Sequence, residues 1–430
     1  MSSESSVSSQ SARNDAHPGA PWMEAPAITS DRPQRLFSAE RLLARRMLHA
    51  LGDPPMMLVL WNGEEIAGSD RRDVPRIFIR DRGALLKLVS NPEFWFGEMF
   101  AERRIEVAGD LAGLIETVYR AMHTTNAGKL SQNPLAQFLD ARRHSVQESK
   151  RNIYHHYDIG NDFYRLWLDA GMSYTCAYYR EESMGLEAAQ TAKMDHVCRK
   201  LWLKPGETVV EAGCGWGAMA LHMARRFGVT VKAFNISREQ LTFARARARA
   251  EGLQDRIAFI EDDYRNIGGE FDAFVSIGML EHVGPAHYQE LGEVIGRSLK
   301  QSGRGLIHSI GRDCPGALNA WIERRIFPGA QPPSLSQMMQ IFEPAGLSVL
   351  DVENLRLHYA RTLEDWLQRF EASAEHVAAM FDPAFVRAWR LYLAGSLAAF
   401  RSGDMQLFQV VFARSGGNDI PWTRRHQYDA

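Results

Sequence analysis

Three glycines at alternate positions follow a carboxylate at residues 211–217, in the run Glu-Ala-Gly-Cys-Gly-Trp-Gly. Two β-branched residues, Val209 and Val210, precede this run, and a helical pattern over 218–227 follows it. Glycine permits a sharp turn and lets the backbone pass close to a ligand. The pattern predicts that Glu211 ends a buried strand and points into the crevice where open α/β sheets bind their ligands.

The glycine spacing separates this turn from a common alternative. Dinucleotide-binding folds use Gly-x-Gly-x-x-Gly, whereas residues 213–217 read Gly-x-Gly-x-Gly. A tight strand-to-helix turn without a ligand is the simpler interpretation of the glycines alone. The run resembles motif I of the class I S-adenosylmethionine (SAM) methyltransferases, which implies that SAM lies over Glu211, Ala212, Gly213, Cys214, Gly215, Trp216 and Gly217.

Strand and helix patterns alternate around this turn. Ser237 and Gln240 form a predicted capping box at the start of one of the helices. The alternation predicts a parallel sheet with helices on both faces. The resemblance to the class I methyltransferases implies that the last two strands form an antiparallel hairpin. The predicted strands are 208–212, 229–234, 257–260, 271–277, 305–310, 347–353 and 406–412. Helical insertions at 312–340 and 361–402 are expected to roof the site.

The remainder of the chain suggests further segments. Residues 1–33 are expected to be disordered because they are polar and rich in Ser, Ala and Pro. We predict a small α+β domain at 34–125, with short antiparallel strands at 57–61 and 76–80, then a linker at 126–151. A catalytic domain over 152–415 and a tail over 416–430 complete the chain.

A predicted helix over 38–51 is amphipathic. Leu42, Leu43, Met47 and Leu51 are expected on one face, with Arg41, Arg45 and Arg46 flanking it. Docking on its own domain is one interpretation, and contact with a membrane surface is the other. A second basic patch, at 142–151, is the other candidate for membrane contact.

An aromatic and polar segment over 153–180 keeps no clean period, which is typical of a pocket wall rather than a core element. Aromatic rings stabilise a cation without reacting with it. The adjacent His155 and His156 do not have the spacing of metal ligands, so we predict no metal. The candidate rings are Tyr154, Tyr157, Phe163, Tyr174, Tyr178 and Tyr359.

Composition limits the function classes. The formal net charge of -2 argues against bulk attraction to nucleic acid. The four cysteines show no paired spacing, and no apolar run is long enough for a membrane span or a secretory signal. We therefore expect a soluble cytoplasmic protein that attaches peripherally to the inner face of the membrane. The oligomeric state stays open, with a homodimer as one option.

Six motifs in order resemble the cyclopropane-fatty-acyl-phospholipid synthase family, which includes the mycolic acid cyclopropane synthases. The resemblance covers about 150–415 and implies a Rossmann-like class I methyltransferase fold with a seven-stranded, mostly parallel sheet and a small N-terminal α+β domain. The motifs are His156-Tyr-Asp-Ile-Gly-Asn-Asp162, Tyr174-Thr-Cys-Ala-Tyr178, the run 211–217, Gly278-Met-Leu-Glu-His-Val-Gly284, His308-Ser-Ile-Gly311 and His358-Tyr-Ala-Arg-Thr-Leu363.

The resemblance implies a reaction. A cis double bond in an acyl chain of a membrane phospholipid attacks the methyl group of SAM, and a carbocation forms. Loss of a proton to bound bicarbonate then closes a cyclopropane ring. An alkene needs alignment and a dry, cation-stabilising pocket more than it needs an activating base.

Site residues follow from the same resemblance. The implied bicarbonate shell is Cys176, Glu281, His308, Ile310 and Tyr359. Besides the run 211–217, the implied SAM contacts are Tyr174, Thr175, Asn235, Ile236, Gln240, Tyr264 and Arg265. Three positions depart from the family pattern: Thr175 stands for the commoner Ser, Glu211 for Asp, and Ser396 for a Cys that many members carry.

Three other functions stay open at this point. Quenching the same cation differently would give a methyl or methylene branch, but relatives of that type tend to lose the His of Glu-His-Val-Gly, and His282 is present. A non-catalytic lipid- or SAM-binding homologue would have no need of Glu281 and His308. A small-molecule methyltransferase would need neither the aromatic segment nor the N-terminal domain.

Overall fold

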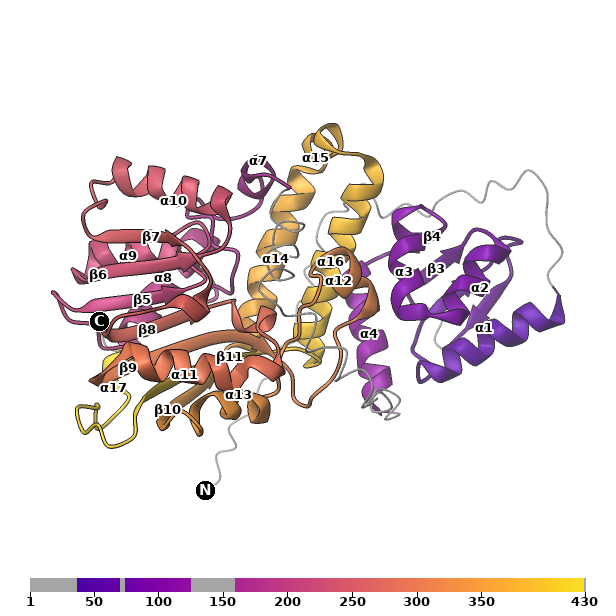
Figure 1. The fold of residues 1–430 in the computed structure, drawn as a ribbon. Helices are drawn as coiled ribbons and strands as arrows, with labels where there is room; N and C mark the ends of the chain where they lie inside the picture. The colour runs from indigo at the N-terminus through magenta and orange to yellow at the C-terminus, as the bar shows by residue number, and fades with distance from the viewer. Residues whose placement is uncertain (1–36, 70–73, 125–158, 429–430) are drawn as a thin grey trace, which may run out of the picture.

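The computed structural model describes residues 37–69, 74–124 and 159–428. A large sheet lies at one end of the molecule, a small N-terminal sheet at the other, and a group of helices between them (Figure 1). The predictions for 1–33, the linker 126–151 and the basic patch at 142–151 lie outside the described residues. The same holds for Tyr154, His155, His156 and Tyr157.

The large sheet has seven strands in the order β10-β11-β9-β8-β5-β6-β7. Strands β5 to β9 pair in parallel, and β11 runs antiparallel to both β9 and β10. This topology confirms the predicted, mostly parallel sheet with its antiparallel final pair. The strands are β5 (Thr208–Ala212), β6 (Thr230–Asn235), β7 (Ile257–Glu261), β8 (Phe271–Ile277), β9 (Leu299–Gly311), β10 (Leu347–Asn354) and β11 (Gln406–Arg414).

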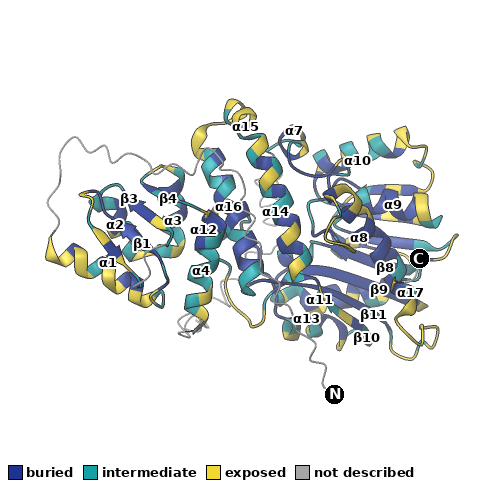
Figure 2. Cartoon of the chain, turned by 180° about the vertical axis from the view of Figure 1, so that it is seen from behind, coloured by how far each residue is buried: buried dark blue, intermediate teal, exposed yellow. Residues whose placement is uncertain are grey.

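Helices cover both faces of this sheet because successive strand residues point to opposite sides. Val209 packs with α8 (Leu186–Lys200), α9 (Ala218–Phe227) and α10 (Arg238–Ala250). Val210 packs with α11 (Tyr288–Ser298) and α13 (Leu335–Phe342). Strands β5, β8 and β11 are consequently buried along most of their length, whereas the edge strands β7 and β10 are partly exposed (Figure 2).

A group of helices stands beside the large sheet. It comprises α12 (Ala320–Arg325), α14 (Arg356–Ala372), α15 (Ala374–Met380) and α16 (Pro383–Ser402), and α16 packs against both α14 and α4 (Leu111–Thr124). Helix α14 begins at Arg356, five residues before the predicted start at 361. The Asn354 Oδ1 atom accepts a hydrogen bond from the Arg356 N–H at 3.0 Å, directly after β10 ends. Tyr359 therefore lies on a helix.

The N-terminal part forms a four-stranded sheet in the order β2-β1-β3-β4. The prediction that residues 57–61 and 76–80 are antiparallel was wrong, because β1 and β3 pair in parallel. Strand β2 takes the antiparallel position beside β1, so β3 joins the other edge of β1 in the same direction as β1. The elements are α1 (Ser38–Ala50), β1 (Met57–Val59), β2 (Glu65–Ala67), β3 (Arg76–Ile79), α2 (Arg82–Ser90), α3 (Pro92–Ala101) and β4 (Ile105–Ala108).

Helix α1 buries most of the predicted face, since Met47 is buried and Leu43 and Leu51 are partly buried. Glu40, Ala44, Met47 and Leu48 are buried, whereas Leu42 is 50% exposed. The buried carboxylate of Glu40 accepts a hydrogen bond from the Phe37 N–H at 2.9 Å and pairs with Arg82. Glu40 thus lies on the buried side of the helix, and Leu42 points outward.

The N-terminal sheet is held against α12 through the segment Gly97-Glu98. The Glu98 Oε1 atom accepts hydrogen bonds from Trp321 Nε1 at 3.0 Å and from Arg325 Nε at 2.7 Å. A Cβ atom at Gly97 would lie 2.4 Å from the Trp321 ring, so only glycine lets the indole pack here. Within the ranges listed at the start of this section, no helix has both the length and the apolarity needed to cross a bilayer.

Candidate active site

A pocket opens at the carboxyl ends of β5, β6 and β8, where open α/β sheets bind their ligands. Its wall includes nine of the residues predicted to contact SAM: Tyr174, Thr175, Glu211, Gly213, Cys214, Gly215, Trp216, Asn235 and Gln240. The other lining residues are Met172, Ser173, Lys193, Ala218, Met219, Ile277, Gly278, Met279 and His282. Ala212, Gly217, Ile236, Tyr264 and Arg265 do not line it.

The glycine run forms the turn that the sequence predicts. Gly213, Gly215 and Gly217 have φ values of 83°, 52° and 82°. The N–H groups of Gly213 and Cys214 donate to the Phe234 carbonyl at 2.9 and 3.1 Å, which fixes the turn against β6. Helix α9 begins immediately afterwards at Ala218. The turn therefore brings backbone and the start of a helix together at one wall of the pocket.

Glu211 is the buried acid of this pocket. Its side chain comes from the end of β5, and its Oε2 atom has no hydrogen-bond partner within the described part of the chain. Burial raises the pKa of Glu211 to about 8, although Lys193 acts in the opposite direction. A buried, unpaired carboxyl group of this kind is suited to receive a cationic or hydrogen-bonding ligand group.

Asn235 and Gln240 supply a neutral polar wall at the end of β6. The Asn235 amide donates to the Gly215 carbonyl at 3.2 Å and to Gln240 Oε1 at 2.8 Å. By contrast, Arg265 pairs with Asp263 and Glu290 and stacks 4.8 Å from the Tyr264 ring, outside the lining. A role for Tyr264 and Arg265 in binding SAM stays a prediction.

A second polar group lies on neighbouring strands. The Ile310 N–H donates to Glu281 Oε1 at 2.6 Å, so the segment that follows β8 contacts the end of β9. Burial raises the pKa of Glu281 to about 7. Its Oε2 atom has no hydrogen-bond partner among the residues that the structure describes.

His308 lies two residues before Ile310 on β9, on the same face of the sheet. Its Nδ1 atom is 3.1 Å from Gln409 Nε2, and its Nε2 atom has no partner in the described ranges. Burial lowers the pKa of His308 well below its usual range, so the imidazole is neutral. Two buried polar atoms, from Glu281 and His308, thus remain available to a small ligand.

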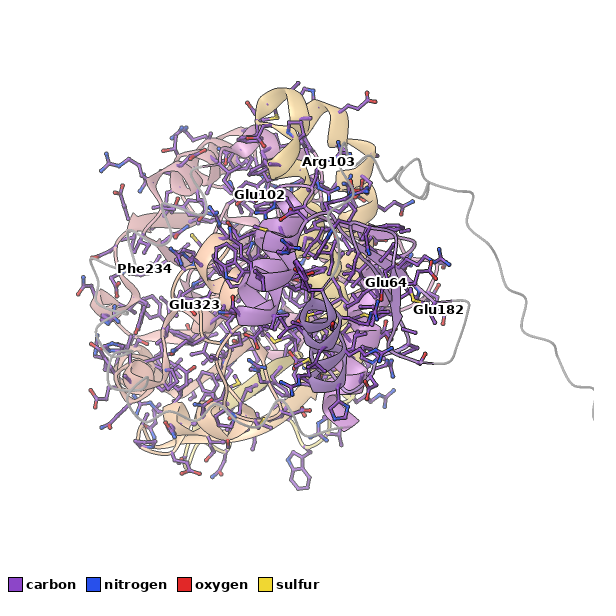
Figure 3. All side chains as sticks on the ribbon, turned by 90° about the vertical axis from the view of Figure 1, so that its right-hand side faces the viewer. Glu64, Glu102, Arg103, Glu182, Phe234 and Glu323 are labelled. Atoms are coloured by element: carbon purple, nitrogen blue, oxygen red, sulfur yellow. The ribbon has the colours of Figure 1, made fainter. Side chains whose placement is uncertain are left out.

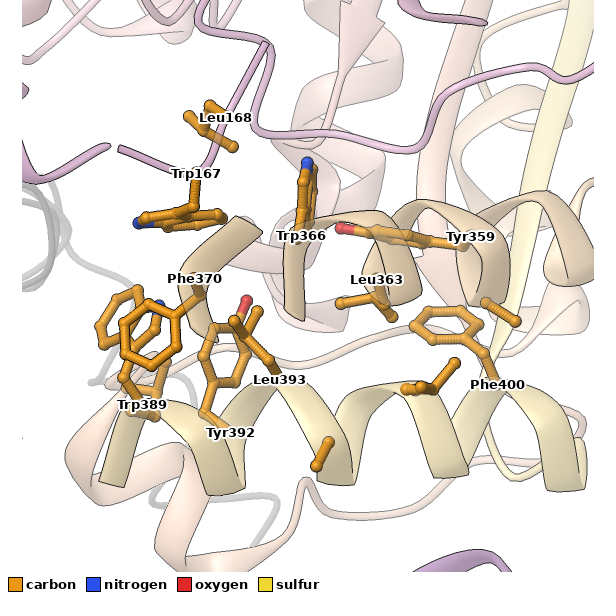
Figure 4. Packing of buried hydrophobic residues seen from close by; sticks show 14 of the residues in the cluster. Trp167, Leu168, Tyr359, Leu363, Trp366, Phe370, Trp389, Tyr392, Leu393 and Phe400 are labelled. Carbon is orange, nitrogen blue, oxygen red and sulfur yellow. The ribbon is translucent and has the colours of Figure 1, made fainter. Parts of the chain in front are cut away.

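Cys176 lies in a loop segment that contacts α14, the helix that carries Tyr359. The Ala177 N–H donates to Thr362 Oγ1 at 3.0 Å, which ties the segment after Cys176 to α14. Burial raises the pKa of the Cys176 thiol, which therefore stays protonated. The Tyr359 ring lies on α14, 4.6 Å from Phe400 and 5.9 Å from Trp366 (Figure 4).

Aromatic rings surround Tyr174 at the pocket wall. Its ring centroid lies 5.3 Å from both Trp167 and Trp366, and its hydroxyl is 2.6 Å from that of Tyr392. The residues that sequence reasoning missed are Trp167, Trp366, Tyr392 and Lys193. No motif or spacing singles out these four residues, and only their convergence near Tyr174 and the pocket marks them as site residues.

Other predicted rings pack elsewhere. Phe163 lies among Trp389, Phe385 and Phe381, and Tyr178 stacks between His196 and His358. Ser396 is half-buried on α16 and does not line the pocket.

The family model for mycolic acid cyclopropane synthetase matches residues 144–410. The chain belongs to this family. A second model, for a domain of unknown function, matches residues 43–129 and thus covers the small N-terminal sheet. Members of the mycolic acid cyclopropane synthetase family are SAM-dependent enzymes of fatty acyl chains, and membership removes the non-catalytic alternative.

Individual relatives of the mycolic acid cyclopropane synthetase family agree on the broad chemistry. A probable fatty acid methyltransferase of Pseudomonas putida is 35% identical and covers 87% of this chain and 96% of its own length. The cyclopropane-fatty-acyl-phospholipid synthase of Escherichia coli K12 is 39% identical and covers 65% of this chain and 73% of its own length. The protein therefore carries out SAM-dependent cyclopropanation or methylation of unsaturated fatty acyl chains.

A solved structure supports the fold assignment. Mycolic acid cyclopropane synthase CmaA1, complexed with SAH and CTAB, aligns with a TM-score of 0.58 at 29% identity. The alignment covers 61% of this chain and 97% of CmaA1. The residues present here fit SAM, since an unpaired buried carboxyl group, a glycine turn and a neutral amide pair meet in one pocket.

Proposed function

We propose that this protein forms cyclopropane rings at the cis double bonds of unsaturated acyl chains in membrane phospholipids. When bound, SAM supplies the methylene carbon and bicarbonate accepts the released proton. The observation that carries the proposal is that two buried atoms, Glu281 Oε2 and His308 Nε2, have no hydrogen-bond partner among the described residues, and that Glu281 also accepts from the Ile310 N–H at the end of β9, the strand of His308. Together they offer one acceptor and one imidazole nitrogen to an anion that needs both.

The chain's own residues divide the remaining tasks. Glu281, held by the Ile310 N–H, orients a small hydroxylated anion, and neutral His308 faces it without adding charge. Tyr174, Trp167 and Trp366 present ring faces that stabilise a developing cation and exclude water. His282 in the pocket lining supports ring closure over branching.

Lipid analysis tests the proposal. The full-length protein is expressed in cells with an oleate-rich membrane, and labelled SAM traces the added carbon. We expect phospholipid acyl chains that gain one labelled carbon and show upfield cyclopropane protons by NMR. A methyl or methylene branch would replace the proposal with the alternative that the Pseudomonas putida relative's name suggests.

Removal of bicarbonate should slow the reaction. Glu281 Oε2 and His308 Nε2 lack hydrogen-bond partners among the described residues, and we infer that they position bicarbonate, which accepts the proton. In carbon-dioxide-free buffer we expect product formation to fall by about 10²-fold or more, within the range for one general base, and to recover saturably when bicarbonate is restored. A rate that does not respond to bicarbonate at constant pH would exclude this anion.

Binding of S-adenosylhomocysteine should release protons at pH 7. With a pKa of about 8, Glu211 is mostly protonated before binding. An ammonium group arriving beside it favours the carboxylate and lowers that pKa. Calorimetric titrations in two buffers of different ionisation enthalpy should show release of a substantial fraction of one proton. The Glu211→Gln variant should show none, and equal release in both proteins would place the ammonium elsewhere.

Peripheral membrane attachment is also part of the proposal, because the acyl chain lies in the bilayer. The outer face of α1 carries Leu42, Arg45, Arg46 and His49, all exposed. Arg45 and Arg46 form no ion pair with other described residues, whereas Arg41 pairs with Glu64. Figure 3 shows the N-terminal end of the molecule, where labelled side chains of both signs include Glu64, Glu102 and Arg103. The free arginines of α1 are therefore the best-placed cations for anionic lipid.

Replacing Arg45 and Arg46 by Ala should weaken binding to vesicles that contain anionic phospholipid. At about 1 kcal/mol for each basic residue near the surface, the double variant should bind about 30-fold more weakly. Sedimentation with the vesicles measures this, and added salt should narrow the difference. Arg249 and Arg256, which are exposed at the opposite end of the molecule, provide the matched double variant. Equal loss in both double variants would reject α1 as the docking surface.

A further inference from the structure

Lys193 is a buried lysine that lines the same pocket as Glu211 and the glycine turn. It lies on α8, and only 3% of its surface is exposed. Its Nζ atom donates one hydrogen bond, to Thr175 Oγ1 at 3.0 Å. An ammonium group has three N–H donors, so two remain for another partner.

Lys193 forms no ion pair with any carboxylate of the described residues. Lys200 lies two turns further along the same helix. Unlike Lys193 it has an ion pair, since its Nζ atom lies 2.6 Å from Glu353 Oε2. Asp169, the acid with the largest favourable effect on Lys193, uses its carboxylate oxygens to accept from the N–H groups of Gly171 and Ser173, each at 2.8 Å. Burial lowers the pKa of Lys193 from its ordinary value, and buried ammonium groups in proteins are normally paired, so Lys193 is suited to receive an anion.

The surroundings of Lys193 indicate which anion is missing. The acidic side chain of Glu211 and the basic side chain of Lys193 line one pocket, and they form no ion pair with each other. The amino-acid end of SAM carries one ammonium and one carboxylate on the same carbon. A pocket with a separate acid and a separate lysine matches that arrangement group for group.

We propose that Lys193, oriented by Thr175, binds the carboxylate of the methionine moiety of SAM, while Glu211 receives the ammonium. This inference rests on the proposed position of SAM in the pocket, and it assigns Lys193 a role that the motif pattern did not suggest. It also gives the Thr175 hydroxyl a role, because Thr175 Oγ1 holds the ammonium of Lys193 in place.

Bicarbonate is a second anion that Lys193 could bind in place of the SAM carboxylate. Cys176, next to Thr175, belongs to the predicted bicarbonate shell, and Lys193 also acts on the pKa values of Cys176 and His308. Cys176, Glu281 and His308 do not line the pocket that contains Lys193. The geometry therefore favours the methionine carboxylate, and the experiment distinguishes it from bicarbonate.

The test compares two ligands by calorimetry, S-adenosylhomocysteine and its analogue that lacks the carboxylate. The wild-type protein should prefer the intact ligand by at least about tenfold, since loss of the carboxylate leaves a buried ammonium unpaired. In Lys193→Met this preference should disappear, and affinity for the decarboxylated analogue should be retained. That retained affinity also shows that the variant is folded. Lys200→Met, which removes the paired lysine of the same helix, should keep the preference.

The other outcomes each overturn a defined statement. If Lys193→Met weakens both ligands equally, Lys193 is structural and the inference fails. If binding is unchanged but the apparent KM for bicarbonate rises, bicarbonate is the anion and the inference fails. If wild-type protein binds neither ligand, the proposed position of SAM fails as well.

Discussion

The Glu281→Gln variant is expected to form product about 10²–10³-fold more slowly than the wild type, with little change in affinity for S-adenosylhomocysteine. The carboxylate oxygen Oε1 accepts the Ile310 N–H at 2.6 Å, and a Gln carbonyl oxygen can keep that bond. The second position changes from a free acceptor, Oε2, to an NH₂ donor. The variant therefore preserves the fold of the site and removes the one function that we assign to it.

Burial sets the expected pH dependence of this residue. Because the pKa of Glu281 is raised to about 7, the acceptor form grows as the pH rises through 7 and is lost below it. The rate at a constant bicarbonate concentration should therefore fall as the pH is lowered from about 8 to 6. Binding of S-adenosylhomocysteine, measured in parallel, should not follow the ionisation of Glu281.

Glu293→Gln is a control for the same chemical change, since Glu293 is exposed on α11. It should retain wild-type turnover. Unchanged turnover in Glu281→Gln would remove Glu281 from the mechanism. Loss of ligand binding in that variant would show instead that Glu281 supports the pocket.

The Gly213→Ala variant is expected to lose affinity for S-adenosylhomocysteine by about 10²-fold or more. Its φ of 83° costs a residue with a Cβ atom about 1–2 kcal/mol. The added Cβ would also lie 2.9 Å from the Cβ of Met279, another residue of the pocket lining. Relief of this clash moves the turn or Met279, and either movement changes the wall against which the ligand lies.

Gly252→Ala separates these two effects. Gly252 has a φ of 67°, and a Cβ atom there would meet nothing within 4 Å. This variant should show the conformational cost alone, as a lower melting temperature with unchanged affinity. Calorimetry for binding and circular dichroism for unfolding measure the two quantities. If both variants keep full affinity for S-adenosylhomocysteine, the prediction that the ligand lies close to the Gly213 backbone is wrong.

Local patterns in the sequence predicted much of the large sheet. The strand before Glu211, the turn at 213–217 and the helix from 218 depend on neighbours within a few residues, so periodicity and glycine spacing are sufficient. The seven strands lie within a few residues of their predicted positions, apart from the longer β9. The same local reasoning failed at α14, whose start depends on Asn354 at the end of a strand.

Pairing between distant segments was less predictable. Periodicity marks a strand but not its partner, so the parallel pairing of β1 with β3 was missed. For α1, Leu42 was expected on the buried face but is exposed, while the polar Glu40 is buried and held by Phe37 and Arg82. Both errors arise where a tertiary contact outweighs a local preference.

By itself, the sequence determined the order of the motifs, and with it the family, the fold class and the dependence on SAM. Those properties are carried by residue types at fixed separations along the chain. The tertiary structure alone decided that the Ile310 N–H meets Glu281, that Trp167 and Trp366 flank Tyr174, and that Lys193 faces the pocket of Glu211. These contacts join segments far apart in the sequence, and packing of helices against the sheet, rather than any local pattern, brings them together.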